Sequence, residues 1–190
     1  MLNPAITIRV ALPGDVPALL EQMRSLAQFE RYITDFNVDE QALLTRAFGP
    51  DRQCHIFVAE CHGNIVGYAV MIVIRFTFDL KSTLVLKEFF VDGASRGKGV
   101  GSALFRYVAA WALVEGGGRL KWDVMVGNHK AEAFYQKHGG APDTQWIPYV
   151  MNEDALQKAA GVKSTDEKLD SQGRGCAVAQ AVSVRSGSQT

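Results

Sequence analysis

Hydrophobic and polar residues alternate at the start of the chain, and the spacing then changes to that of a helix. Alternation over residues 6–10 predicts a first strand. Apolar residues recur at helical intervals over residues 16–29, which predicts an amphipathic helix after a Pro-Gly break. A second helix is expected over residues 38–48, because Gly49 and Pro50 follow it.

The middle of the chain is rich in β-forming residues. Residues 54–60 and 65–78 have the composition of two strands, and the turn His62-Gly63-Asn64 between them predicts a hairpin. Residues 83–91 are mostly apolar, with apolar residues next to one another instead of only at every second position. This pattern is typical of a central strand that is buried on both faces.

Helical and strand patterns alternate through the rest of the chain up to residue 160. We expect, in order, a helix opened by the glycine-rich segment 96–101 and closed by glycines 116–118, a strand over 120–126, a helix over 128–138, a strand over 146–151 and a short helix over 153–160. The sequence therefore predicts one mixed α/β domain over residues 1–160. Gly, Ser, Gln and charged residues dominate positions 161–190, which predicts an unstructured tail.

Composition narrows the class of protein. Of the 190 residues 47% are hydrophobic, which is enough for a packed core. Lys plus Arg and Asp plus Glu both number 20, so the chain lacks the basic field of nucleic-acid-binding proteins and the polybasic patch of membrane-surface proteins. No apolar run approaches the roughly 20 residues that span a bilayer. Three cysteines without a signal peptide favour reduced thiols in the cytoplasm.

The most informative stretch is an apolar strand that continues through Arg96-Gly97-Lys98-Gly99-Val100-Gly101-Ser102 into a helix. Glycines let backbone N–H groups approach a ligand closely. A helix N-terminus adds unpaired donors and positive partial charge, which suit a pyrophosphate. The pattern is neither a P-loop nor a Rossmann fingerprint. On these residues alone it is either a phosphate-binding turn or a flexible connection.

A second segment, Asn128-x-x-Ala131-x-x-Phe134-Tyr135-x-x-x-Gly139, follows further along the chain. Together with Arg96-x-x-Gly99-x-Gly101 it resembles the two sequence markers of the GNAT N-acetyltransferase superfamily, in the right order and at the right separation. The resemblance covers roughly residues 5–158. It is closest to the diamine and thialysine acetyltransferase branch, on segments 26–30, 88–91 and 96–102 and on Trp146.

The resemblance implies a GNAT fold, in which a mixed, mostly antiparallel twisted sheet of about six to seven strands has helices on both faces and a splayed pair of parallel strands. It implies acetyl-coenzyme A as the cofactor, held by the backbone of Phe90 and Val91 and by the loop from Arg96 to Ser102. It also implies transfer of the acetyl group to the primary amine of a small molecule by direct attack in a ternary complex. Members of the branch commonly pair, so a homodimer is expected.

Asn128 and Tyr135 each have a structural interpretation beside the functional one. Asn128 can simply cap the helix that follows it, and the resemblance adds a hydrogen bond with the pantetheine arm; Ala131 belongs to the same cofactor-binding marker. Tyr135 can be a core aromatic, or it can be the general acid that the resemblance implies. A departing thiolate needs a proton, and a phenol close to the sulfur supplies it.

The general base is the point at which the chain departs from the branch. The branch has a strand glutamate at the position of Lys87, whereas the acidic residue here is Glu88, one position later. Successive strand residues face opposite sides, so Glu88 can replace the missing acid only if a bulge re-aims it. Otherwise Glu88 contacts the substrate amine, or it is merely a charge at the edge of a strand.

The acceptor pocket only partly matches that of a polyamine enzyme. Glu30 and Asp79 match acidic positions of the branch, and Trp146 matches its tryptophan. Lys87 places a cation where the branch has an anion, which disfavours a polycation and favours an acceptor with an anionic group, such as an amino acid or an aminoalkylphosphonate. If Lys87 points to solvent instead, a diamine remains a possible substrate.

Two other functions compete with a small-molecule acetyltransferase. A peptide or protein N-acetyltransferase needs an open groove, against which Trp146 argues, and a catalytically silent acyl-coenzyme A-binding module would not need Tyr135. Two Cys-His pairs at residues 54–55 and 61–62 suggest zinc. Neighbouring strand residues point apart, so the four side chains should not converge, and no metal is expected.

Overall fold

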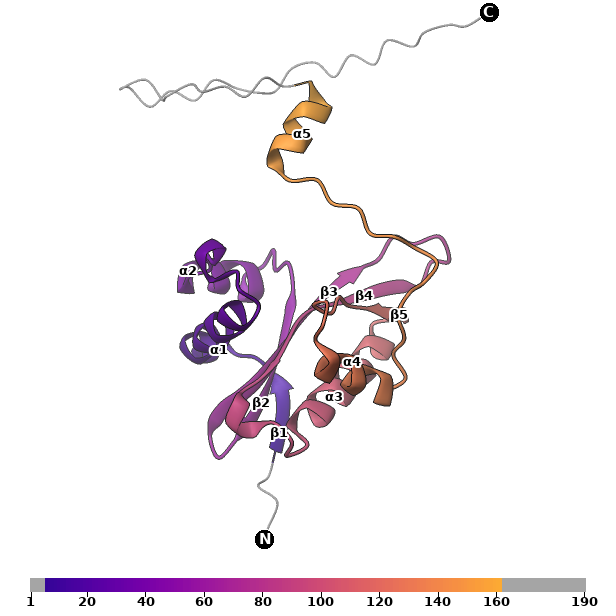
Figure 1. Cartoon of the computed structure of the whole chain (residues 1–190). Coiled ribbons are helices and arrows are strands. Elements are labelled where there is room, and N and C mark those ends of the chain that lie inside the picture. Colours follow the sequence, from indigo (N-terminus) through magenta and orange to yellow (C-terminus); the bar gives the residue numbers. More distant parts are fainter. Residues whose placement is uncertain (1–5, 162–190) are drawn as a thin grey trace, which may run out of the picture. The chain divides into compact units, whose positions relative to one another are not determined.

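A computed structural model describes residues 6–161 of the chain. These residues fall into two units, which meet in sequence at Gly140 and Ala141 and are each described by themselves. The larger unit is built on a five-stranded sheet (Figure 1). Apart from Gly161, the predicted tail over residues 161–190 lies outside the described residues.

The strands of the sheet follow one another in sequence order. They are β1 (Ile6–Val10), β2 (His55–Cys61), β3 (Asn64–Ile74), β4 (Ser82–Val91) and β5 (Gly117–Lys121). The first four pair antiparallel, and β5 pairs parallel with β4. This arrangement confirms the predicted α/β fold with a mixed, mostly antiparallel sheet.

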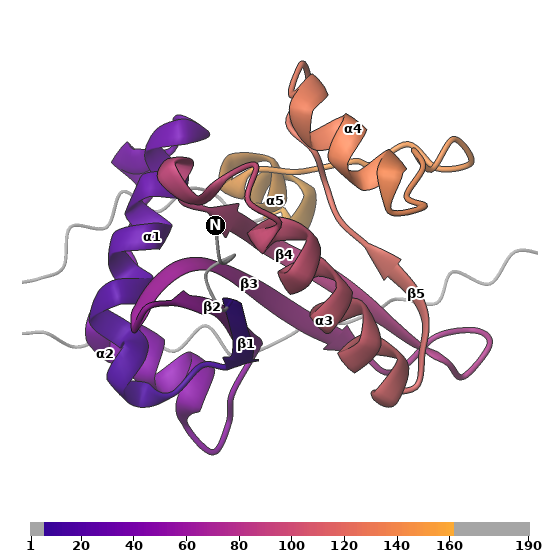
Figure 2. The same cartoon turned by 90° about the horizontal axis from the view of Figure 1, so that it is seen from below.

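Helices cover both faces of the sheet, as Figure 2 shows. On one face lie α1 (Val16–Phe29) and α2 (Glu40–Leu43), the second of which continues as a wider helical turn over Leu44–Phe48. On the other face lies α3 (Val100–Val114), and α4 (His129–Lys137) packs its aromatic residues against the same core. In the smaller unit, α5 (Glu153–Ala160) begins after Asn152, whose side chain accepts a hydrogen bond from the Ala155 N–H.

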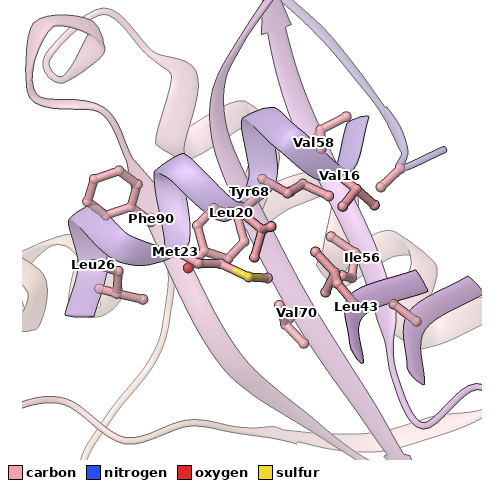
Figure 3. Close-up of a cluster of buried hydrophobic side chains, with 13 residues drawn as sticks. Val16, Leu20, Met23, Leu26, Leu43, Ile56, Val58, Tyr68, Val70 and Phe90 are labelled. Atoms are coloured by element: carbon pink, nitrogen blue, oxygen red, sulfur yellow. The ribbon is translucent and has the colours of Figure 1, made fainter. Parts of the chain in front are cut away.

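The core under α1 explains why this segment forms an amphipathic helix. One stripe of α1 is buried, comprising Val16, Leu19, Leu20, Met23, Leu26 and Ala27. Most of these side chains pack against strand residues that include Ile56, Val58, Tyr68, Val70 and Phe90 (Figure 3). Each large apolar side chain that is fully buried contributes roughly 1.5–3 kcal/mol to folding. The helix is therefore anchored firmly, and its C-terminal end is held next to β4.

The two parallel strands diverge. β5 pairs with β4 only over residues 82–85, whereas β4 continues to Val91. The splayed parallel pair implied by the sequence markers is thus present. On this side of β4, the backbone groups beyond residue 85 have no strand partner among residues 6–161. Such groups need a hydrogen-bond partner when they are covered.

A bulge interrupts β4 just where the strands diverge. Glu88 pairs with Val70 and Leu86 pairs with Met71, which leaves Lys87 as an extra residue without a partner on β3. The extra residue reverses the alternation of the faces. As a result Leu86 points into the core under α3, while Phe90 points into the core under α1.

Two predicted strands are corrected by the structure. The strand expected over residues 120–126 is β5, which begins at Gly117 and ends at Lys121. A Cβ at Gly117 would lie 2.6 Å from both the Ala112 carbonyl oxygen and the Leu84 side chain, so this glycine is a tightly packed strand residue and no mere linker.

The strand expected over residues 146–151 does not form, and among the described residues the sheet has five strands where six to seven were predicted. Apolar side chains suggested that strand, but Pro148 lies in its middle and has no N–H to donate to a ladder. Apolar composition alone is therefore a poor predictor of a strand here.

Candidate active site

A cleft of about 690 Å³ opens where β4 and β5 diverge. Its walls come from the end of α1, from β4, from the glycine-rich loop before α3, from residues 122–125 after β5 and from α4. Most of the residues singled out in the sequence line it: Glu30, Lys87, Glu88, Phe90, Val91, Arg96, Gly97, Gly99, Gly101, Ser102, Asn128, Ala131 and Tyr135. Residues from distant parts of the sequence thus meet in one cavity.

The glycine-rich loop has a backbone that favours glycine at two positions. Gly97 and Gly99 have φ of 74° and 88°, in the left-handed region. No heavy atom lies within 4 Å of a Cβ built on either residue, so the space in front of them is open to a ligand. Gly99 is the N-cap of α3, which places the positive end of the helix dipole at the cleft. Lys98 and Val100 do not line the cleft: Lys98 is exposed, and Val100 is buried beside Val91 and Ala59.

Arg96 ties this loop to the end of β4. Its Nε donates a hydrogen bond to the Val91 carbonyl oxygen at 2.8 Å. The guanidinium carbon lies 5.7 Å from the ring centroid of Phe29 and 5.5 Å from that of Phe90. These cation–π contacts fix a positive charge on the cleft wall between α1 and β4.

Asn128 and Tyr135 mark the two ends of the face that α4 presents to the cleft. The side-chain oxygen of Asn128 accepts a hydrogen bond from the Ala131 N–H at 3.2 Å, so Asn128 does cap the helix. Burial, together with the charge of Glu30, raises the pKa of Tyr135 to about 12. The phenol is therefore neutral near pH 7 and has a proton to donate.

Two carboxyl groups share the opposite wall of the cleft. The Tyr68 hydroxyl donates a hydrogen bond to Glu88 Oε2 at 2.7 Å. Burial raises the pKa of Glu88, although the hydrogen bond from Tyr68 and the charge of Lys87 act in the opposite direction. Burial and the Glu88 charge likewise raise the pKa of Glu30, and Lys87 opposes them. A carboxylate with a raised pKa is a better proton acceptor than an ordinary one.

The bulge that the sequence argument required for Glu88 is present. Because Lys87 is the extra residue, Glu88 lies with Phe90 on the face of β4 toward α1 and no longer shares a face with Leu86, which packs under α3. Lys87 itself is exposed and also lines the cleft. A cation and two carboxyl groups thus stand on the same wall.

Two predicted substrate residues are not brought into this cleft by the larger unit. Asp79 is in the loop between β3 and β4, where it accepts a hydrogen bond from the Thr77 hydroxyl at 2.9 Å and lies 3.7 Å from an Arg119 nitrogen. These contacts give Asp79 a local role in the turn. Trp146 belongs to the smaller unit and is 72% exposed. A contact of either residue with substrate stays a prediction.

Trp122 and Tyr68 are among the aromatic residues at or behind the cleft wall that sequence reasoning missed. Trp122 lines the cleft, and its ring centroid lies 4.9 Å from that of Tyr135. Tyr68 is fully buried behind the cleft wall. A tyrosine in an otherwise apolar strand is a signal in itself, because a buried hydroxyl requires a partner. The identity of the partner depends on strand register, which the sequence does not show.

Other kinds of site find little support in the described part of the chain. Residues 6–161 contain no group of three or more His, Cys, Asp or Glu side chains that could hold a metal ion. Cys54 and Cys61 are free thiols. Every helix in the same range is too short or too polar to span a bilayer.

The splayed strand pair, the glycine-rich turn at the N-terminus of α3 and Tyr135 meet in one cleft, as the resemblance to an acyltransferase superfamily implied. The sequence pattern of the acetyltransferase (GNAT) family matches residues 19–140. The chain belongs to this family, and it is an N-acetyltransferase enzyme.

Individual relatives agree with this assignment. The thialysine N-epsilon-acetyltransferase of Sus scrofa is 29% identical over 168 residues, which cover 83% of this chain and 98% of the relative. An uncharacterized N-acetyltransferase of Bacillus subtilis, YhfO, is 25% identical and covers 79% of this chain and 99% of its own length. An integron cassette protein of V. cholerae has the same fold, with a TM-score of 0.69 and 23% identity over 82% of this chain and 97% of that chain.

Proposed function

We propose that this enzyme transfers the acetyl group of acetyl-coenzyme A to the primary amine of a small molecule. One observation carries the proposal: a single cleft contains the glycine-rich loop, a neutral phenol at Tyr135 and a carboxyl group with a raised pKa at Glu88. The three features supply what direct acetyl transfer needs, namely an anion-binding turn, an acid and a base.

The chain's residues fit the cofactor. Backbone N–H groups of the loop over residues 97–102 would hold the pyrophosphate, with the dipole of α3 and the charge of Arg96 in support. The edge of β4 at Phe90 and Val91, which has no strand partner on this side within residues 6–161, would bind the pantetheine amides; Asn128, Lys130 and Ala131 line the same cleft. When bound there, acetyl-coenzyme A supplies an activated thioester.

Two side chains would move the protons. A carbon–nitrogen bond forms as the carbon–sulfur bond breaks, and Tyr135 donates its proton to the departing sulfur. Glu88 accepts the proton that the amine loses, directly or through a water. The raised pKa of Glu88 suits this role, since a base works best when its pKa approaches the working pH.

The acceptor is proposed to carry an anionic group beside its amine. Lys87 lines the cleft close enough to oppose the raised pKa of both Glu30 and Glu88. An amine would lie near the two carboxyl groups and a carboxylate or phosphonate near Lys87. The thialysine N-epsilon-acetyltransferase relatives are consistent with this, since their names denote an acceptor with both an amine and a carboxylate.

The test is a panel of acceptors with the full-length chain. Acetyl transfer is followed by thiol release with thialysine, lysine, other amino acids, aminoalkylphosphonates, spermidine and a short peptide. We expect small zwitterionic amines to have the highest kcat/KM. Transfer confined to the peptide would refute a small-molecule function, and no transfer to any amine despite tight acetyl-coenzyme A binding would favour a silent binding module.

The chain is further proposed to act as a homodimer in the cytoplasm. Exposed apolar side chains in the smaller unit offer a surface for a second copy: Trp146, Ile147, Tyr149 and Val150 are each more than 70% exposed. Free thiols at Cys54 and Cys61 are compatible with a reducing compartment. A monomer mass in light scattering at micromolar concentration would contradict the dimer.

A further inference from the structure

Tyr68 is a polar residue in the core that the chemistry above does not use. Its side chain is fully buried among the apolar residues under α1, and Figure 3 shows it between Met23 and Phe90. It does not line the cleft. A buried hydroxyl without a partner is costly, and the partner here is Glu88 Oε2, at 2.7 Å.

The bulge at Lys87 is what makes this hydrogen bond possible. Tyr68 pairs with Phe90 across the sheet, and Glu88 lies two positions before Phe90 on β4. Tyr68 and Glu88 are therefore diagonal neighbours on one face, a separation that a long side chain spans. Without the extra residue, Glu88 would share the face of Leu86, which packs in the core under α3, and would point away from Tyr68.

Glu88 consequently contacts both the buried core and the cleft. One oxygen of its carboxyl group is held by the buried Tyr68 hydroxyl, while the residue lines the cavity. Within residues 6–161, Tyr68 is the one residue with a hydrogen bond to this carboxyl group. Within the same residues the second oxygen has no hydrogen-bond partner, and the first is held by a buried group that does not line the cleft.

We propose that Tyr68 is a positioning residue, which orients the Glu88 carboxyl group toward the acceptor amine and favours its charged form. The inference rests on the proposed function, because it assigns a task to the base of that reaction. A hydroxyl that donates to a carboxylate stabilises the charged form. Tyr68 thereby offsets part of the effect of burial, which raises the pKa of Glu88.

Other groups around Glu88 bear on its titration as well. Lys87 on β4 favours the charged form, and Glu30 at the end of α1 interacts unfavourably with it. Tyr32, after α1, and Cys54, before β2, also lie in the field of Glu88, which contributes to the raised pKa of each. Tyr68 alone among these groups donates a hydrogen bond to the carboxyl group.

The experiment measures the pH dependence of kcat/KM in Tyr68→Phe, which keeps the ring and removes the hydroxyl. We expect the acidic limb of the profile to move to higher pH, because Glu88 loses the donor that favours its charged form. In a Glu88→Gln background, Tyr68→Phe should cause no further change in the profile. Tyr32→Phe is the matched control and should leave the limb in place.

A second measurement needs no turnover. With ¹³C-labelled glutamate, the Glu88 carboxyl resonance should titrate at higher pH in Tyr68→Phe than in the wild type. An unmoved titration, or an equal effect of Tyr68→Phe in the Glu88→Gln background, would overturn the inference even if Glu88→Gln is itself slow. Wild-type kcat/KM in Glu88→Gln would instead overturn the role of Glu88 as base, and the positioning role of Tyr68 with it.

Discussion

The ring of Trp122 stacks at a tilt on that of Tyr135, with 4.9 Å between centroids and 41° between planes. Phe105 of α3 touches both rings, at 5.9 Å from Trp122 and 5.7 Å from Tyr135. The ring of the proposed acid is therefore held in a packed aromatic cluster. Because well-packed rings cannot move independently, a substitution that displaces the Trp122 ring should also displace the Tyr135 ring.

Gly140→Ala tests this coupling. A Cβ at residue 140 would lie 2.6 Å from Cζ2 and 2.9 Å from Cη2 of Trp122, so the indole must shift. We expect a loss of stability of about 1–3 kcal/mol from overpacking, together with a lower kcat. Thermal unfolding and steady-state kinetics measure the two effects. Trp122→Phe in the same variant makes room and should restore part of the stability; no restoration would argue against the clash.

Tyr135→Phe tests the general acid. The ring and its contacts with Phe105 and Trp122 remain, so the fold and the affinity for acetyl-coenzyme A should be unchanged. We expect kcat to fall by roughly 10²-fold or more, the usual contribution of a general acid. Tyr107→Phe on α3, which does not line the cleft, is the control and should keep wild-type kcat. A fall of equal size in both variants would assign the loss to structure.

Gly99→Glu tests the pyrophosphate loop. The new carboxylate would stand in the open space in front of the loop and repel the cofactor, so calorimetry should show a large loss of acetyl-coenzyme A affinity. Gly139→Glu is a matched control: Gly139 has nearly the same φ, 86° against 88°, and the same open surroundings, but does not line the cleft. Equal affinities in the two variants would rule out the loop as the binding site.

Lys87→Glu tests the preference for an acceptor with an anionic group. Reversal of the charge should swing relative kcat/KM from zwitterionic amines toward spermidine, by about tenfold or more after solvent screening. Lys87→Gln removes the charge without reversing it. Its ratio of kcat/KM for zwitterionic amines to kcat/KM for spermidine should lie between those of the wild type and Lys87→Glu. Wild-type activity on spermidine equal to that on zwitterionic amines would defeat the proposal.

Glu88→Gln tests the raised pKa through stability. A carboxyl group whose pKa is raised on folding contributes stability that is present below its unfolded pKa and is lost as the pH rises through the folded value. As the pH rises from about 4 to about 8, the Tm of the wild type should therefore fall further than the Tm of Glu88→Gln. The amide oxygen can still accept from Tyr68, so the fold is kept. Parallel Tm curves would indicate an ordinary pKa for Glu88.

The sequence by itself determined the family and named most of the predicted site residues that the structure brings into one cleft. The two markers located the glycine-rich loop at residues 96–102 and the helix with Tyr135, because a glycine-rich turn and a helix start are local features. Periodicity located α1, the β2–β3 hairpin and β4, since each buries one face or both faces by its own pattern. It failed at residues 146–151, where the side chains suit a strand but Pro148 interrupts the ladder.

Only the tertiary structure decided how the proposed base, Glu88, is presented to the cleft. The sequence posed the condition that a bulge must re-aim Glu88, but the pairing of Val70 with Glu88 and of Met71 with Leu86 is a relation between two strands. The hydrogen bond from Tyr68 follows from that pairing. A one-residue change of register exchanges the two faces of a strand. Residues fixed by register, such as Tyr68 behind Glu88, therefore emerge only when the strands are placed side by side.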